Sequence, residues 1–260
     1  MKLFDTHAHC DDERFMNEYE GGTDGVIRDC LNDKIGNIVN IGTNLDNSKR
    51  SIELSEKYDE VYATVGIHPT DAELYDDVDD VICQLEKMLF HPKVVAIGEI
   101  GLDYHWQNVP REKQILFFKK QMELAAKHNI PVVIHDREAH GDCFEIIKEF
   151  PTVKGIFHCF SGSAEMAREL VRLGWYISFA GAITYKNAIQ PKEACKAVPD
   201  DRLLIETDAP YLTPVPHRGE LNRSSYVYFT ACEVANQRGT TVDEIAKITY
   251  ENAKRVFRIG

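Results

Sequence analysis

The sequence Asp5-Thr-His7-Ala-His9 directly follows an apolar lead-in at Met1 to Phe4. Side chains alternate between the two faces of a β-strand, so Asp5, His7 and His9 are predicted to point to one side. Two imidazoles at one strand end can bind one cation. An isolated pair is also common as hydrogen-bonded structural histidines, so the interpretation depends on the residues at the ends of later strands.

Four later apolar runs repeat this arrangement. They are Val94-Val-Ala-Ile-Gly-Glu99, Pro131-Val-Val-Ile-His135, Gly155-Ile-Phe-His158 and Leu203-Leu-Ile-Glu-Thr-Asp208. Short β-branched runs are typical of buried strands in a parallel sheet. A polar residue at one strand end is equally well explained as a cap, but the repetition favours a shared metal site.

The complete pattern predicts a (β/α)8 barrel, formed as a single domain over residues 1–260. The candidate ligands follow the carboxyl ends of their runs, where barrel active sites form. An open doubly wound sheet is the alternative, although no glycine-rich dinucleotide turn follows the first strand. The eight strand-like runs are Lys2–Thr6, Gly36–Ile41, Val61–Val65, Val94–Ile97, Pro131–Ile134, Gly155–Phe157, Trp175–Phe179 and Arg202–Ile205.

Helical patterns lie between these runs. Residues 47–58 are expected to form a helix capped by Asp46 or Asn47, and the acidic stretch 76–80 reads as a solvated helix start. A helix is predicted over 111–129 after Pro110, and another up to Leu173, capped by Ser161 or Ser163. The last helices are expected between residues 224 and 257.

Composition restricts the class of protein. The chain has 260 residues, enough for a substantial core without disulfides, and its seven cysteines are widely spaced, as in reduced cytosolic proteins. Its first ten residues do not resemble a signal peptide and no long apolar segment follows, so a cytoplasmic protein without membrane contact is predicted. The net charge of −12 argues against a protein that wraps duplex nucleic acid, but not against an enzyme that binds a strand end. No obligate protein partner is inferred.

Six motifs together resemble the TatD family of metal-dependent hydrolases, which belongs to the amidohydrolase-like superfamily. The longest are Gly98-Glu-Ile-Gly-Leu-Asp-Tyr104 and Glu206-Thr-Asp-Ala-Pro-Tyr-Leu212. The others are Asp5-Thr-His-Ala-His9, Gly66-Ile-His-Pro69, His135-Asp-Arg137 and His158-Cys-Phe-Ser-Gly162. The resemblance spans nearly the whole chain and implies a TIM barrel with hydrolase activity. Characterised members of the family include metal-dependent deoxyribonucleases that shorten DNA from the 3′ end.

The resemblance also implies roles for individual residues. The metal ligands would be His7, His9, Glu99, His135, His158 and Asp208, with Glu99 bridging two divalent ions. Catalysis would rest on Asp208 and Glu99: the metals activate a shared water, Asp208 orients it or accepts its proton, and hydroxide attacks phosphorus in line. The resemblance favours Mg²⁺ or Mn²⁺ for activity, and four imidazoles also suit Zn²⁺.

Three further residues are predicted to contact substrate. Arg137 follows His135 by two positions and either holds phosphate oxygens or forms a salt bridge with Asp136 or Glu138. His68 either hydrogen-bonds a phosphate or a metal-bound water, or is structural. In the loop after Asp208, Arg218 matches the family's basic pattern.

The same loop departs from the family at Glu220, where a basic residue is usual, and at Ser224, where proline is common. Glu220 therefore either weakens the binding of nucleic acid or points harmlessly to solvent.

Several residues near the expected site have two interpretations. Asp103 and Tyr104 are expected to contact the metal ligands, rather than the metal itself, and to orient them. The rings of Tyr104, Trp106 and Tyr211 either stack on unpaired bases or pack at the rim, and Cys159 is either a packing residue or a nucleophile.

The predicted function is a divalent-metal-dependent deoxyribonuclease that cleaves phosphodiester bonds at single-stranded or frayed DNA 3′ ends. The alternative is a two-metal hydrolase of a carbonyl substrate, either a small cyclic amide, lactone or ester, or a D-aminoacyl-tRNA ester. Fold and ligands alone do not separate these two chemistries.

Overall fold

Short buried strands alternate with helices along the whole chain in the computed structural model, which describes residues 2–260. The strand order β1 to β8 follows the sequence. The chain divides into two units, residues 1–40 with 158–260 (unit 1) and residues 41–157 (unit 2).

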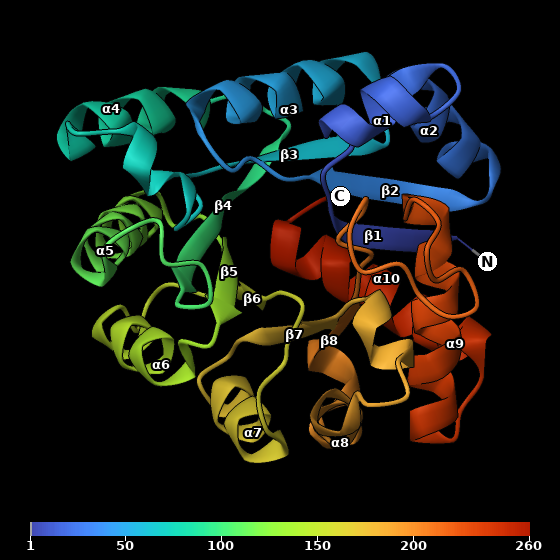
Figure 1. Ribbon diagram of the computed structural model, residues 1–260. Coiled ribbons are helices and arrows are strands. Elements are labelled where there is room, and N and C mark those ends of the chain that lie inside the picture. Colours follow the sequence, from blue (N-terminus) through green and yellow to red (C-terminus); the bar gives the residue numbers. More distant parts are fainter. Residues whose placement is uncertain (1) are drawn as a thin grey trace. The chain divides into compact units, whose positions relative to one another are not determined.

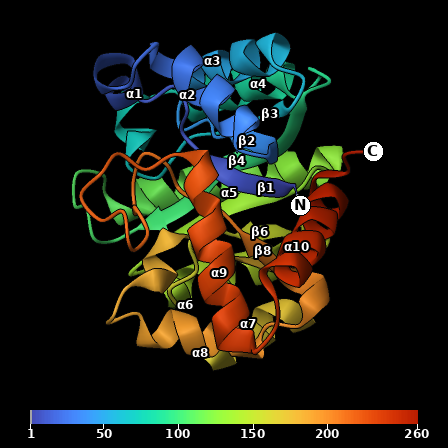
Figure 2. The same ribbon diagram turned by 90° about the vertical axis from the view of Figure 1, so that its right-hand side faces the viewer.

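Unit 1 contains the first two and the last two strands, and the pairs β1 with β2 and β7 with β8 are parallel. Helices α9 and α10 pack together in this unit (Figure 2). The strands are β1 (Leu3–Ala8), β2 (Ile35–Asn40), β7 (Tyr176–Phe179) and β8 (Leu203–Ile205). The helices are α1 (Glu13–Glu18), α2 (Gly22–Asn32), α7 (Ala164–Arg172), α8 (Ile189–Ala197), α9 (Val227–Arg238) and α10 (Val242–Phe257), with 3-10 turns η2 (Gly181–Thr184), η3 (Asp200–Arg202) and η4 (Ser224–Tyr226).

Unit 2 contains the four middle strands, paired in parallel from β3 to β6. Helix α3 packs on β3 and helix α5 on β4 (Figure 1). The strands are β3 (Val61–Val65), β4 (Val94–Asp103), β5 (Val132–Arg137) and β6 (Gly155–Phe157). The helices are α3 (Leu45–Lys57), α4 (Val78–Met88), α5 (Arg111–His128) and α6 (His140–Glu149), with the 3-10 turn η1 (Asp71–Leu74).

The predicted end of the fourth strand is wrong. The expected strand stops at Ile97, where the apolar run ends, but β4 continues to Asp103 because Ile100 to Asp103 pair with Ile134 to Arg137 of β5. The register shifts between Ile97 and Ile100. Strands β1 and β5 also extend past their predicted ends, so His7 and His135 lie within strands.

The helix starts are partly as predicted. Ser163 caps α7 by accepting from the amide of Met166, and α4 begins after its N-cap Asp77 within the acidic stretch. The predicted cap of α3 is wrong, because Asn44, rather than Asp46 or Asn47, accepts from a first-turn amide.

Among residues 2–260, no helix is long and apolar enough to cross a membrane. All seven cysteines are free.

Two buried glutamines on α5 each bind the backbone of one residue, Ile67 after β3 or Asp103 at the end of β4. Gln121 accepts from the amide of Ile67 (2.7 Å) and donates to its carbonyl (3.1 Å). Gln114, two turns earlier, accepts from the amide of Asp103 (2.9 Å) and donates to its carbonyl (3.0 Å). Each side chain therefore pairs both polar groups of one backbone residue, which would otherwise lie buried without these partners.

Replacing Gln121 with Met keeps the side-chain volume but leaves the amide and the carbonyl of Ile67 without this partner. We expect the free energy of unfolding to fall by about 2 to 6 kcal/mol, since each of the two buried unpaired groups costs about 1 to 3 kcal/mol. Urea titration measures the change. The control Glu123→Met, at an exposed position of the same helix, is expected to shift it by less than about 0.5 kcal/mol; equal shifts for both variants would contradict the prediction.

Candidate metal centre

A parallel backbone ladder places the end of β1 beside the segment after β8. The amide of Asp208 donates to the carbonyl of His7 (2.9 Å), and the amide of His9 donates to the carbonyl of Ala209 (2.7 Å). Ala8 and Ala209 form the bridge between these two bonds. The backbone thus sets the positions of the His7, His9 and Asp208 side chains.

Three side-chain atoms converge at this ladder. The Nε2 atoms of His7 and His9 are 3.3 Å apart, and each lies 3.5 Å from Oδ1 of Asp208. The point equidistant from the three atoms is about 2.0 Å from each, which matches the bond lengths that Zn²⁺ and Mg²⁺ form in proteins. The donor set and its spacing therefore fit a divalent cation.

The charge of Asp208 suits this role. Burial acts to raise its pKa, but a hydrogen bond from His9 and the proximity of His7 and His158 outweigh burial and lower the pKa. Its backbone has a φ of 57°, in the left-handed region that side chains other than glycine rarely adopt. The carboxylate is thus held ionised in a backbone conformation fixed by its surroundings.

Asp5 anchors the segment that carries Asp208. Its carboxylate accepts from the amide (2.9 Å) and the hydroxyl (2.5 Å) of Thr207, and burial raises its pKa to about 7. The Thr207 hydroxyl in turn accepts from the amide of Ala209 (3.1 Å). Asp5 thus supports the segment after β8 that carries Asp208.

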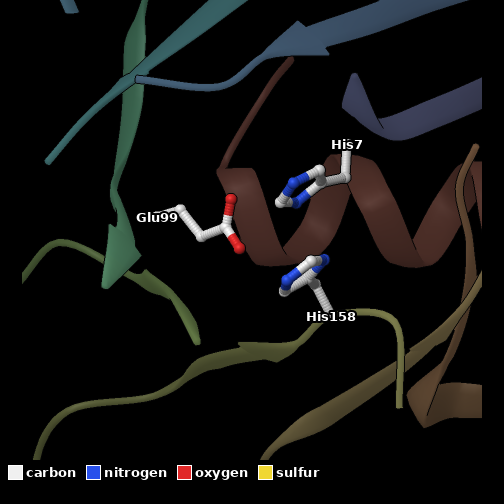
Figure 3. Close-up of side chains that lie close together, drawn as sticks. All are labelled: His7, Glu99 and His158. Atoms are coloured by element: carbon white, nitrogen blue, oxygen red, sulfur yellow. The ribbon is translucent and has the colours of Figure 1, made fainter. Parts of the chain in front are cut away.

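His158, directly after β6, also belongs to unit 1. Figure 3 shows its ring parallel to that of His7, with centroids 3.9 Å apart and an interplanar angle of 7°. Its Nδ1 lies 3.2 Å from Oε1 of Glu206, which also accepts from the amide of Cys159 (2.7 Å). The carboxylate of Glu206 thus orients the His158 ring through Nδ1.

Sequence reasoning missed Glu206. Its side chain is fully buried, and within residues 2–260 its Oε2 has no hydrogen-bond partner. The available signal was its position two residues before Asp208, at the end of the apolar run 203–205. A buried carboxylate behind a histidine is the usual way in which proteins orient a metal-binding imidazole.

Unit 2 carries a second group of ligand-type residues. Nδ1 of His135 lies 2.7 Å from Oε1 of Glu99, and its Nε2 lies 2.9 Å from Oδ2 of Asp103. Glu99 extends from β4 (Figure 3). His68 completes the group: its Nε2 is 3.6 Å from Oε1 of Glu99, and its Nδ1 is 2.6 Å from the Thr70 hydroxyl.

Hydrogen bonds from two backbone amides hold the Asp103 carboxylate in place to accept from His135. Its Oδ1 accepts from the amides of His105 (3.0 Å) and Trp106 (2.9 Å), and Gln114 holds its backbone. Burial acts to raise its pKa, but the hydrogen bonds from His135 and the Trp106 amide outweigh burial and lower the pKa. His68, Asp103 and His135 also offer ligand atoms within 4.8 Å of one another.

Known proteins are similar to this chain in sequence and in fold. Residues 4–258 match the family model described as TatD related DNase. The chain belongs to the TatD family. The metal-dependent hydrolase YabD of Bacillus subtilis, whose function is uncharacterised, is 46% identical over 99% of this chain and 100% of its own length. A similar uncharacterised hydrolase of Mycoplasma genitalium, MG009, is 37% identical over 99% of both chains.

The crystal structure of YJJV, a TatD homologue from Escherichia coli, matches 99% of this TatD-family chain and 98% of its own with a TM-score of 0.91 at 30% identity. The predicted (β/α)8 barrel is thereby confirmed. The chain is a metal-dependent hydrolase of this family. The single domain over residues 1–260 stays a prediction.

In this TatD-family hydrolase, Arg137 does not form the alternative salt bridge. Asp136 and Glu138 each contact a histidine instead, and Arg137 makes no ion pair within residues 2–260. Its guanidinium carbon lies 5.7 Å from the ring centroid of Trp106. Arg137 is exposed, which leaves its charge accessible to a substrate.

Side-chain contacts stabilise the loop after Asp208. Arg218 lies over the ring of Tyr185, 4.0 Å from the centroid. Glu220 does not simply point to solvent, because its carboxylate contacts Nδ1 of His217 (3.0 Å) and accepts from the Tyr226 hydroxyl (2.7 Å). The residue that departs from the family pattern thus stabilises the loop that presents Arg218.

Tyr104 does not contact the candidate ligands as expected. Its hydroxyl donates to Asp142 (2.5 Å), and Arg111 lies over its ring at 4.0 Å. It therefore joins α5 to α6, whereas Asp103, the residue before it, contacts His135 directly.

Changing Asp103 to Asn removes the charge that holds His135 while keeping the side-chain shape. We expect divalent metal binding to weaken about 10- to 100-fold, as is usual when the support of a metal-binding histidine is lost. Titration calorimetry of the metal-free protein with Mn²⁺ measures this. Asp79→Asn, at an exposed position of α4, serves as the control, and wild-type affinity in Asp103→Asn would refute the prediction.

Proposed function

We propose that the protein is a divalent-metal-dependent deoxyribonuclease that removes nucleotides from the 3′ ends of single-stranded or frayed DNA. The observation that carries the proposal is the triangle of His7, His9 and Asp208, whose donor atoms are spaced for a divalent cation. The description of the matching family as TatD related DNase supports the choice of DNA as substrate.

The proposed centre holds two divalent ions. Barrel enzymes assemble their sites from residues at the carboxyl ends of several strands. On that basis, Glu99 would help to hold the two ions, with its carboxylate as the oxygen ligand that they share. The complete ligand set is His7, His9, Glu99, His135, His158 and Asp208.

When bound, the divalent ions lower the pKa of water and neutralise charge on phosphoryl oxygens. Asp208 accepts the proton of the attacking water on its carboxylate, which the neighbouring histidines keep ionised. Asp103 and Glu206 hold the rings of His135 and His158 in fixed orientations. Mg²⁺ or Mn²⁺ is proposed for activity, while the imidazole-rich donor set also accepts Zn²⁺.

Substrate binding falls to three cationic or polar side chains. Arg137 has an exposed guanidinium that can hold two phosphate oxygens at once, and the exposed indole of Trp106 beside it offers a face to an unpaired base. Arg218, in unit 1, provides a second positively charged side chain. His68, in unit 2, provides a hydrogen-bond donor.

The same residues would hydrolyse a carbonyl substrate, either a cyclic amide, lactone or ester or a D-aminoacyl-tRNA ester. The accessible charge of Arg137 favours a substrate that carries phosphate over a small cyclic amide, lactone or ester, which gives the arginine nothing to neutralise. A D-aminoacyl-tRNA ester also carries phosphate, so the cleavage test below separates it from DNA. The cytoplasmic location stays a prediction.

The proposed activity is tested with metal-free protein restored separately with Mg²⁺, Mn²⁺ or Zn²⁺. On single-stranded DNA labelled at the 5′ end, we expect a ladder of products that shortens stepwise from the 3′ end. Asp208→Asn is expected to lower kcat by at least about 100-fold, because a group that accepts the proton of the attacking water contributes about 10²- to 10⁴-fold.

Calorimetry of Asp208→Asn establishes how much metal that variant retains, and Asp79→Asn is the matched control. Wild-type turnover in Asp208→Asn with full metal occupancy would reject its catalytic role. A folded, metal-loaded wild type that cleaves lactones or esters but no DNA would establish the carbonyl alternative.

Arg137→Ala separates substrate holding from structural support. We expect KM for single-stranded DNA to rise about 10- to 150-fold with kcat within about twofold of the wild type, since one charge-assisted contact is worth about 1.5 to 3 kcal/mol. The control Arg168→Ala removes an exposed arginine of α7 and is expected to change neither constant. A fall in kcat and melting temperature without any change in KM would assign Arg137 a structural role.

A further inference from the structure

Tyr211 is an exposed aromatic residue at a fixed distance from a candidate metal ligand. Its amide donates to the carbonyl of Asp208 (2.8 Å), which closes a tight turn. Its ring meets that of His9 edge to face, with centroids 6.0 Å apart. Nevertheless, 47% of the residue remains accessible to solvent.

Two charged residues from the start of α1 hold this ring in place. The Tyr211 hydroxyl donates to Oδ2 of Asp12 (3.0 Å). The guanidinium of Arg14 binds both oxygens of the same carboxylate, at 3.0 and 3.2 Å. The guanidinium carbon lies 4.1 Å from the centroid of the Tyr211 ring.

Asp12 thus orients a planar cation against an aromatic ring. Arg14 is itself partly exposed, with 36% of its side chain accessible. The result is a rigid stack with two flat surfaces, a guanidinium and a phenol ring, next to the group of His7, His9 and Asp208.

We infer that Tyr211 and Arg14 form a nucleobase-binding site, which stacks the base of the nucleotide whose phosphate the metal centre binds. This inference rests on the proposed function, which supplies a nucleotide at that centre. Aromatic rings and arginine planes both stack on bases without selecting their identity. Such a site is expected to accept any unpaired terminal nucleotide.

A simple structural role does not account for the same observations. A tyrosine needed only for its hydrogen bond to Asp12 gains nothing from an exposed ring, because the hydrophobic effect favours its burial. The carboxylate of Asp12 is also already paired by Arg14. The exposed ring is therefore better explained by a ligand that covers it.

The test compares two probes that share a sugar and a phosphate but differ in the base: 2′-deoxyadenosine 5′-monophosphate and 2-deoxyribose 5-phosphate. Titration calorimetry with the Mg²⁺-loaded protein measures both dissociation constants. We expect the wild type to bind the nucleotide about 5- to 150-fold more tightly, the range that stacking of one base provides.

Tyr211→Leu keeps an apolar side chain against His9 but removes the aromatic face, and it is expected to bind both probes equally. Tyr211→Phe retains the ring and is expected to keep most of the preference. Tyr228→Leu, at another exposed tyrosine, is the matched control, and melting temperatures establish that each variant is folded.

The site is overturned if the wild type binds both probes equally or binds neither, or if Tyr211→Leu keeps the wild-type preference. Preference for the nucleotide without cleavage of any DNA would reject the proposed deoxyribonuclease while supporting the base site. Cleavage of DNA by a wild type that binds both probes equally would support the deoxyribonuclease and reject the base site. If Tyr211→Leu fails to fold, Arg14→Met is tested in its place. The proposed site of Tyr211 and Arg14 is then overturned if Arg14→Met prefers the nucleotide over the sugar phosphate as strongly as the wild type does.

Discussion

The ladder between residues 7–9 and 208–209 is the constraint on which the candidate metal centre depends. Two backbone hydrogen bonds join His7 to Asp208 and His9 to Ala209, and the Asp5 carboxylate secures Thr207 behind them. A backbone ladder positions its side chains more rigidly than a flexible loop does. The spacing of the three donor atoms is therefore a property of the strands, and it does not depend on a bound ion to gather the side chains.

Support for the histidines differs between the units. Asp103 contacts Nε2 of His135, whereas Glu206 contacts Nδ1 of His158, so the two carboxylates contact opposite ring nitrogens. Asp103 is itself bound by two amides and by the clamp of Gln114, while Glu206 has one oxygen without a hydrogen-bond partner in residues 2–260. The same task is thus performed with a fully satisfied carboxylate in one unit and a half-satisfied one in the other.

Much of this arrangement could be predicted from the sequence. Apolar runs that end in histidine or carboxylate identified the strands and the fold, because parallel strands are buried on both faces and leave a plain signal. Strand ends were harder to predict: β4 runs past Glu99 to Asp103, since backbone pairing with β5 continues where the apolar pattern has stopped. Roles that depend on contacts between distant residues, such as those of Glu206 and of Arg14 over Tyr211, leave no periodic signal. The identities of the metal ligands stay predictions.

The two units differ in how far apart along the chain their contacts lie. Residues 41–157 form one continuous segment, so each strand of unit 2 pairs with the next one to be synthesised. Unit 1 joins the first residues of the chain to its last hundred, and Asp5 finds Thr207 at a separation of 202 residues. The contacts that bring His7 and His9 beside Asp208 therefore join segments far apart in the sequence, and forming them closes a longer loop than the strand pairs of unit 2 do. Because distant contacts form more slowly than local ones, the three donor atoms of the candidate site are expected to come together after the strands of unit 2 have paired.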